Sequence, residues 1–110
     1  MKGRENLGDF EHLVMLALMR LGEQAYGVTL RQEIASRTHR DVSIGAVYAT
    51  LDRLQRKGYV RSQMGDPTPQ RGGKRKRFFR ITASGAAAVN RTHRALKSMA
   101  EGLRLSEKLS

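Results

Sequence analysis

The stretch from Ser43 to Val60, SIGAVYATLDRLQRKGYV, changes its periodicity at Gly58. Before Gly58, at about 100° per residue, four apolar residues fall within about a quarter of a helix circumference. They are Ile44, Val47, Leu51 and Leu54. After Gly58 the period changes to two, which is typical of a strand. An amphipathic helix that ends at a glycine and passes directly into a strand favours a helical fold with a small sheet.

The outer face of this helix, residues 43–57, is unusual for a solvated surface. Its first half carries almost no side chains (Gly45, Ala46, Ala49), and its second half is cationic (Arg53, Arg56, Lys57). Ser43 can cap the helix, and Tyr48 lies at the border, where its hydroxyl can reach outward. Small residues let a helix backbone approach base edges in a major groove. The alternative is that these are surface or packing positions without a partner.

The rest of the chain supplies the other elements of a small mixed fold. Asp9 is a candidate N-cap for the first helix, which Gly22 closes and which is apolar on more than one side. The expected helices and strands are 10–21, 28–38, 43–57, 59–64, 74–82 and 82–105. This order predicts a mainly α fold with a small β-hairpin, namely a winged helix-turn-helix (9–82) followed by a C-terminal helix (83–106).

Composition restricts the partners of the chain. Lysine and arginine outnumber aspartate and glutamate by 21 to 10, which gives a formal net charge of +11. Such a charge attracts polyanions, so nucleic acid or an anionic membrane surface is the leading partner class, and the alternative is a merely basic, solubilising surface. The longest apolar run, LVMLALM, is too short to span a bilayer, so we expect no membrane partner and a cytoplasmic location.

No pattern typical of an enzyme occurs in the sequence. Cysteine is absent, and the three histidines (His12, His39, His93) fall in separate segments without metal-ligand or nucleophile–base spacing. We therefore expect no catalytic residue, no metal site and no cofactor.

A dense cluster of cations occupies residues 71–77, which we expect at the tip of the hairpin. It contains no acid and includes the pair Gly72-Gly73; its cations are Arg71, Lys74, Arg75, Lys76 and Arg77. Cations beside flexible glycines suit phosphates or a narrow minor groove. The alternative is a charged edge strand that prevents aggregation, although one or two charges are enough for that purpose.

Three stretches resemble the PadR family of bacterial transcription regulators. They are FEHLVMLALMRLGEQAYGVTLRQEI, SIGAVYATLDRLQRKGYV and GGKRKRFFRITASG. The similarity covers nearly all of residues 9–105 and is closest to the short branch, which has a single C-terminal helix. The resemblance implies a homodimer in which each subunit presents a recognition helix and a wing to one half of a roughly palindromic operator.

The resemblance also implies roles for particular residues. Ser43, Ala46, Tyr48 and Ala49 match the reading end of the recognition helix, and Tyr26 and Gly27 match the start of the second helix, near phosphate. In the family the last helix packs against the N-terminal region of the partner, which implies Phe10 and Val14 as contacts. Some short members bind flat aromatic effectors between subunits, but the last helix here has no aromatic residue. An effector of unknown chemistry is left open.

The last helix carries its own periodic signal. Val89, Leu96 and Leu103 recur every seven residues, with His93, Met99 and Ala100 beside them. Such a repeat fits a seam with a partner helix and fits equally well packing onto the first helix of the same chain. The resemblance favours the dimer, with Val89, Leu96, Met99 and Leu103 in its interface.

These observations predict a sequence-specific double-stranded DNA-binding transcription regulator, which we expect to be a repressor associated with the nucleoid when bound. Recognition helix 43–57 and basic wing 71–77 form its DNA surface, with these site residues: Tyr26, Ser43, Gly45, Ala46, Tyr48, Ala49, Arg53, Arg71, Lys74, Arg75, Lys76 and Arg77. The alternative is a sequence-neutral architectural or RNA-associated protein, which would share the charge and the wing.

Overall fold

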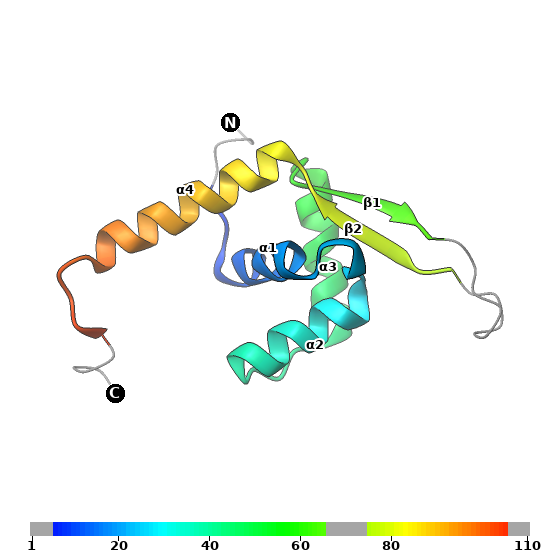
Figure 1. The fold of residues 1–110 in the computed structure, drawn as a ribbon, viewed down its shortest axis with the longest axis horizontal. Helices are drawn as coiled ribbons and strands as arrows, with labels where there is room; N and C mark the ends of the chain where they lie inside the picture. The colour runs from blue at the N-terminus through cyan, green and yellow to red at the C-terminus, as the bar shows by residue number, and fades with distance from the viewer. Residues whose placement is uncertain (1–5, 66–74, 106–110) are drawn as a thin grey trace.

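Four α-helices, one short 3₁₀ helix and a two-stranded hairpin make up the described part of the chain (Figure 1). The structure is a computed structural model that describes residues 6–65 and 75–105. Its elements are α1 (Asp9–Leu21), the 3₁₀ helix η2 (Gly22–Gln24), α2 (Gly27–Thr38), α3 (Ile44–Arg56), β1 (Val60–Met64), β2 (Arg77–Ile81) and α4 (Ala83–Ala100). The predicted order of elements and the winged-helix class are confirmed.

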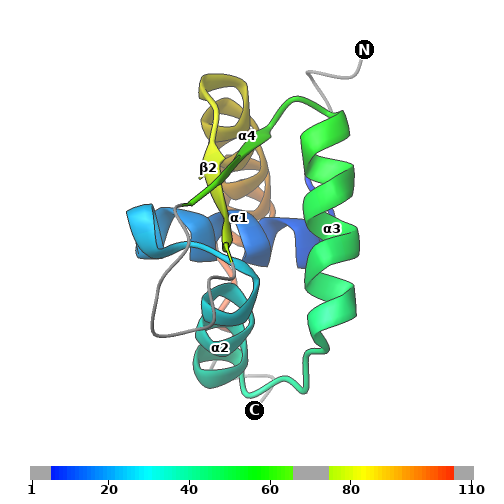
Figure 2. The ribbon, with the colours of Figure 1, turned by 90° about the vertical axis from the view of Figure 1, so that its right-hand side faces the viewer.

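Helix α1 is the centre of the core. It contacts α2, α3, α4 and β2, and its side chains Val14, Met15 and Leu18 are buried. An apolar surface on more than one side of a helix has to be covered by several elements, which is the arrangement seen in Figure 2. The N-cap differs from the prediction: it is Gly8, whose amide donates to Glu11, and Asp9 is the first helical residue.

Helix α3 packs on the core through a stripe slightly different from the predicted one. Val47, Leu51 and Leu54 are fully buried, but Ile44 is 39% exposed. Thr50 takes the fourth buried position instead, where its hydroxyl accepts a hydrogen bond from Arg53 Nη2 at 3.1 Å. Both α1 and α2 contact α3, so two neighbours rather than one determine which of its positions are buried.

The two strands of the hairpin are antiparallel. The first of them begins just after Gly58, where the chain changes direction at the end of α3. This glycine has φ +80°, a left-handed conformation that favours glycine, and the chain then enters β1. Val60 pairs with Ile81 and Ser62 with Phe79. Phe79 is buried, so one of the two phenylalanines of β2 anchors the hairpin to the core.

Helix α4 begins in the core and then leaves it (Figure 1). Ala88, Val89 and Thr92 are buried, whereas the residues that follow are exposed. The helix ends at Ala100, earlier than the predicted residue 105, and Gly102 beyond it has φ +85°. Leu103 therefore lies past the end of the helix, and the seven-residue repeat does not run along one continuous helix.

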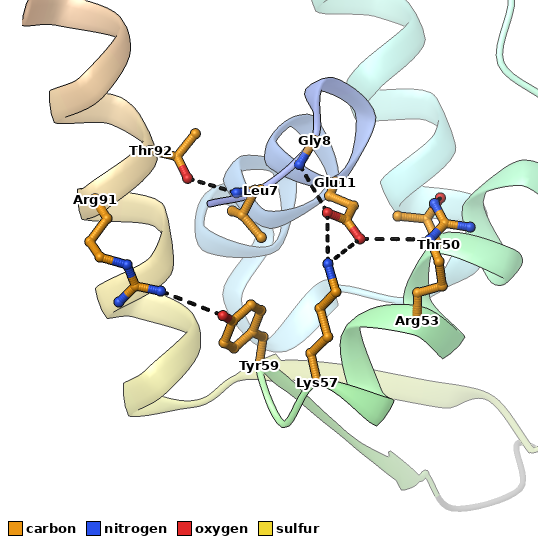
Figure 3. Close-up of polar contacts among 9 residues, drawn as sticks. All are labelled: Leu7, Gly8, Glu11, Thr50, Arg53, Lys57, Tyr59, Arg91 and Thr92. Atoms are coloured by element: carbon orange, nitrogen blue, oxygen red, sulfur yellow. Dashed lines mark hydrogen bonds and ion pairs between the residues drawn. The ribbon is translucent and has the colours of Figure 1, made fainter. Parts of the chain in front are cut away.

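A polar junction joins α1, α3 and α4 (Figure 3). The Glu11 carboxylate accepts hydrogen bonds from Gly8 N at 2.9 Å and from Lys57 Nζ at 3.0 and 3.2 Å, and it lies 3.6 Å from Arg53 Nε. Burial alone would raise the pKa of Glu11, but the Gly8 amide, Lys57 and Arg53 together outweigh it and lower this pKa. The carboxylate is therefore ionised at neutral pH.

The close approach of α4 to the turn before β1 gives a packing prediction. A Cβ on Gly85 would overlap the carbonyl oxygen of Tyr59 and lie 2.9 Å from Met15 Cε. Gly85→Ala should lower the free energy of unfolding by about 1–3 kcal/mol, measured by urea denaturation, because backbone atoms cannot move aside easily. Gly45→Ala is the control: no atom lies within 4 Å of that added Cβ, so the change should stabilise by about 0.5–1 kcal/mol. Equal stability of the two variants would contradict this packing.

The lowered pKa of Glu11 gives a pH prediction. A carboxyl whose pKa falls on folding stabilises the protein above its ordinary value of 4.5 and loses that contribution as pH falls through the folded pKa. The difference in free energy of unfolding between wild type and Glu11→Gln should therefore be largest above pH 4.5 and shrink below it. Denaturation curves between about pH 7 and pH 3 measure this difference. The exposed Glu23, changed to Gln, serves as control, and a difference for Glu11→Gln that stays constant with pH would refute the ion pair.

Candidate nucleic-acid interface

The first half of α3 presents a nearly bare surface. Ser43 Oγ accepts a hydrogen bond from the Ala46 amide at 3.0 Å, which confirms Ser43 as the N-cap. Gly45, Ala46 and Ala49 are exposed, and an added Cβ on Gly45 would meet no atom within 4 Å. The backbone of this turn is therefore open to any flat or grooved partner that approaches it.

Tyr48 bridges the bare surface and the start of α2. Its ring is partly exposed, and its hydroxyl lies against Gly27, the first residue of α2. A Cβ at position 27 would overlap the tyrosine ring, so a glycine there lets Tyr48 lie over the N-terminus of α2. Helix N-terminal amides attract anions, and this position brings a phenolic hydroxyl to the same end.

The hairpin is fixed beside α2 by backbone and ring contacts. Tyr26 forms a β-bridge with Phe78, and their rings meet edge to face with centroids 5.5 Å apart. The Phe79 amide donates to Ala25 O at 2.9 Å. Lys76 Nζ lies 4.5 Å from the centroid of the Tyr26 ring and donates to its hydroxyl at 3.3 Å. Tyr26 thus orients a wing cation, a role that the sequence did not reveal.

An open groove of about 560 Å³ lies between the hairpin, the start of α2 and Tyr48 of α3. Both tyrosines and three wing cations line it, together with two apolar side chains: Tyr26, Tyr48, Arg75, Lys76, Arg77, Val28 and Met64. The structure thus brings residues 75–77 of the predicted wing beside Tyr48 of the predicted recognition helix. Of the other predicted wing cations, Arg71 and Lys74 lie outside the described residues.

The cations of the second half of α3 differ in their surroundings. Arg53 was predicted to contact DNA, but its guanidinium is paired with Glu11 and hydrogen-bonded to Thr50 within the subunit. Lys57 is also bound to Glu11. Arg56 is exposed, and within residues 6–65 and 75–105 it forms none of the observed ion pairs. Arg56 therefore joins Arg53, whose side chain is itself 48% exposed, among the cations on the open surface.

Three exposed charged residues of α3 and the hairpin were not among the predicted site residues, and Arg80 lies beside Glu23 rather than in the groove. Asp52 is exposed on α3, one turn before Arg56, so the outer face is not purely small and cationic. Arg61 and Arg80 stand opposite each other across the hairpin, and both are exposed. Like charges directly opposite in a sheet repel each other, so an anionic partner would relieve this pair. The alternating pattern of the strands could have identified both arginines.

The expected dimer residues divide into a buried and an exposed group. Val14 and Val89 are buried in the core of the subunit, so we remove them from the expected interface. Phe10 is half-buried, with the Arg40 guanidinium 5.7 Å from its ring centroid. Leu96, Met99 and Leu103 are 59%, 81% and 61% exposed, and on α1 the side chains of Leu16 and Met19 are exposed as well.

Histidines and acids do not gather into a site in the described part of the chain. No group of three or more His, Cys, Asp or Glu residues there could hold a metal ion. His12 is buried in α1, and burial lowers its pKa, with a further lowering by His93 and an opposing effect of Asp9. Among the same residues, no helix has the length and apolar character needed to cross a membrane.

Relatives of this chain include two curated bacterial proteins. Transcriptional regulator Rv3488 of Mycobacterium tuberculosis is 35% identical over 79 residues, which cover 70% of this chain and 67% of the relative. An uncharacterised protein, X, of Lysinibacillus sphaericus is 38% identical over 72 residues, or 64% of this chain. The match spans 63% of the length of protein X, slightly less than two thirds.

Solved structures share the fold. A PadR family transcription regulator of Clostridium difficile superposes with a TM-score of 0.72 at 17% identity, over 94% of this chain and all of that one. The winged-helix DNA-binding protein F93 of STIV gives 0.66 at 20% identity, over 89% of this chain and 98% of that one. At these identities the likeness establishes the winged-helix fold. The sequence profile of the Transcriptional regulator PadR-like family matches residues 15–91, and the chain belongs to this family.

Proposed function

We propose that the chain is a sequence-specific double-stranded DNA-binding transcription regulator that binds a roughly palindromic operator as a homodimer. The observation that carries the proposal is the bare first half of α3 beside a cationic hairpin, with an open groove between them. Membership in a family of transcriptional regulators supports it. Such a dimer acts as a repressor if its operator overlaps a promoter, and it acts in the cytoplasm, on the nucleoid.

The residues that line the groove beside Tyr48 are of the kinds expected at a binding site for a DNA backbone. When a helix enters the major groove and a wing enters the neighbouring minor groove, one phosphate strand passes between them. Here the hydroxyls of Tyr26 and Tyr48 and the side chains of Lys76 and Arg77 line that passage. Arg75 Nε donates to Gly65 O at 2.8 Å, which fixes this guanidinium near the base of the wing.

Direct reading of bases by α3 must be sparse. Gly45, Ala46 and Ala49 cannot form hydrogen bonds through their side chains, so only Ser43 and apolar contacts can distinguish base edges. We infer that the shape of the DNA supplies much of the sequence preference, because a closely fitting helix backbone and minor-groove arginines both respond to groove width.

The homodimer is proposed from the course of α4. The apolar face of α4 is buried in the core at Val89. Farther along, where the helix extends away from the rest of the subunit (Figure 1), the same face is exposed at Leu96 and Met99. Exposed apolar side chains in line with a core face mark an interface. A second copy of the chain offers a matching surface, since Leu16 and Met19 of α1 are exposed too.

The competing function is a sequence-neutral nucleic-acid binder. The net charge of +11 and the exposed Arg61–Arg80 pair favour it, because neither feature requires a particular base sequence. Selection of bound duplexes from a random pool, followed by competition with random DNA, separates the two functions. A specific regulator should prefer its selected site by about a thousandfold or more at physiological salt. A much smaller preference would favour the neutral binder.

A substitution on the bare surface tests the placement of α3. Ala49→Glu should weaken binding to the selected duplex by at least about a hundredfold, because it adds bulk and a negative charge facing DNA. Fluorescence anisotropy measures the affinity. Ala87→Glu is the matched control, since Ala87 is exposed on α4, opposite its apolar face. Normal affinity of Ala49→Glu would mean that this face of α3 does not enter a groove.

A substitution at the end of α4 tests the dimer. Met99→Glu should halve the mass in sedimentation equilibrium at micromolar concentration, because a carboxylate at the most exposed apolar position cannot be buried against a partner. Asn90→Glu, exposed on the opposite face of the same helix, makes the same charge change and should leave the mass unaltered. A wild-type chain that sediments as a monomer would refute the dimer without reference to DNA.

A further inference from the structure

Glu11 is the only acid among the buried residues of the described chain. The side chain of Glu11 is 9% exposed, and its two cationic partners on α3, Arg53 and Lys57, are 48% and 24% exposed. Helix N-capping needs one carboxylate oxygen, and Oε1 serves the Gly8 amide. Lys57 Nζ donates to both carboxylate oxygens, at 3.2 Å to Oε1 and 3.0 Å to Oε2, and Oε2 also lies 3.6 Å from Arg53 Nε.

The position of these cations matters because of what lies on the same helix. Arg53 lies in the second half of α3 and Lys57 is the C-cap residue of this helix, whose first half carries the bare surface. Flexible cations near DNA add attraction to phosphate that does not depend on sequence. Such attraction strengthens binding to every competing site, so it lowers the ratio between specific and random binding.

The junction around Glu11 also fixes α3 to the rest of the subunit (Figure 3). Leu7, next to Gly8, donates its amide to Thr92 Oγ1 at 2.9 Å, a buried contact with α4. Arg91 Nη2 lies 3.5 Å from the hydroxyl of Tyr59, three residues past the end of α3. The second half of α3 is therefore held on the same framework as the helix that leads into the proposed dimer surface.

We propose that Glu11 is a positioning residue for specificity, which withholds Arg53 and Lys57 from DNA phosphates and holds the second half of α3 at a fixed angle. This inference rests on the proposed function of α3 as a recognition helix. In this arrangement Arg56 is the cation of this half that is left to meet the DNA backbone. Neutralising Glu11 releases two positive charges on the reading helix and loosens its attachment to α1.

The test compares Glu11→Gln with wild type on two duplexes of equal length, the selected site and a random sequence, over a series of salt concentrations. Glutamine can still accept from the Gly8 amide, so the cap is retained. We expect Glu11→Gln to bind random DNA more tightly. The slope of the logarithm of its binding constant against the logarithm of salt concentration should steepen by the equivalent of about one or two phosphate contacts. The ratio of specific to random affinity should fall by about tenfold. An unchanged slope with an unchanged ratio would overturn the inference.

A matched pair of arginine variants keeps the test decisive if Glu11→Gln folds poorly. Arg53→Gln should leave the salt slope on random DNA unchanged, because this guanidinium is already bound to Glu11. Arg56→Gln should reduce the slope by about one contact. An equal reduction by both variants would show that Arg53 reaches phosphate and would refute the inference. Circular dichroism well below the melting temperature confirms that each variant is folded.

The two proposals fail in different ways. A wild-type chain that binds the selected and the random duplex equally well would refute sequence-specific regulation. The salt dependence of binding to random DNA would still show whether Glu11 keeps Arg53 and Lys57 from phosphate, because electrostatic binding to phosphate does not require a specific site.

Discussion

The packing of α1 is the constraint on which the other elements depend. This helix is apolar on several sides, and its buried side chains meet α2, α3, α4 and the hairpin. Because no single neighbour can cover such a surface, α2, α3, α4 and β2 are all packed against α1, and β1 is held through β2 and α3. The same helix carries Glu11, the buried acid that binds the reading helix. Core packing and the orientation of the DNA-facing surface are therefore set by one element.

The charge of the molecule has a distribution that its total does not reveal. A formal net charge of +11 suggests a uniformly positive surface. The cationic side chains of α3 and the hairpin nevertheless differ in their surroundings. Lys57 and Arg53 are turned toward a carboxylate, Lys76 lies over an aromatic ring, and Arg56 is exposed. The Glu11 carboxylate offsets part of the positive field of Arg53 and Lys57, so a count of cations overstates the field near these two side chains.

Much of the fold could be predicted because its signals are local. Ser43 caps α3 as its side chain and position suggest, Gly58 reverses the chain, and Thr82 caps α4 with its hydroxyl accepting from the Gly85 amide. The errors lie where distant elements decide the outcome. Ile44 is at the edge of the α3 contact, Val14 and Val89 are core residues, and α4 ends before Leu103. Periodicity identifies the apolar face of a helix but not which neighbour covers it.

The sequence by itself determined the elements, their order and the bare, then cationic, face of α3, since capping, glycine conformation and apolar spacing act within a few residues. Only the tertiary structure decided which cations are free. Glu11 and Lys57 are 46 residues apart, and Tyr26 and Lys76 are 50 apart. No local pattern can pair side chains over such separations, because their contact exists only after α1 and the hairpin have packed against the helices between them.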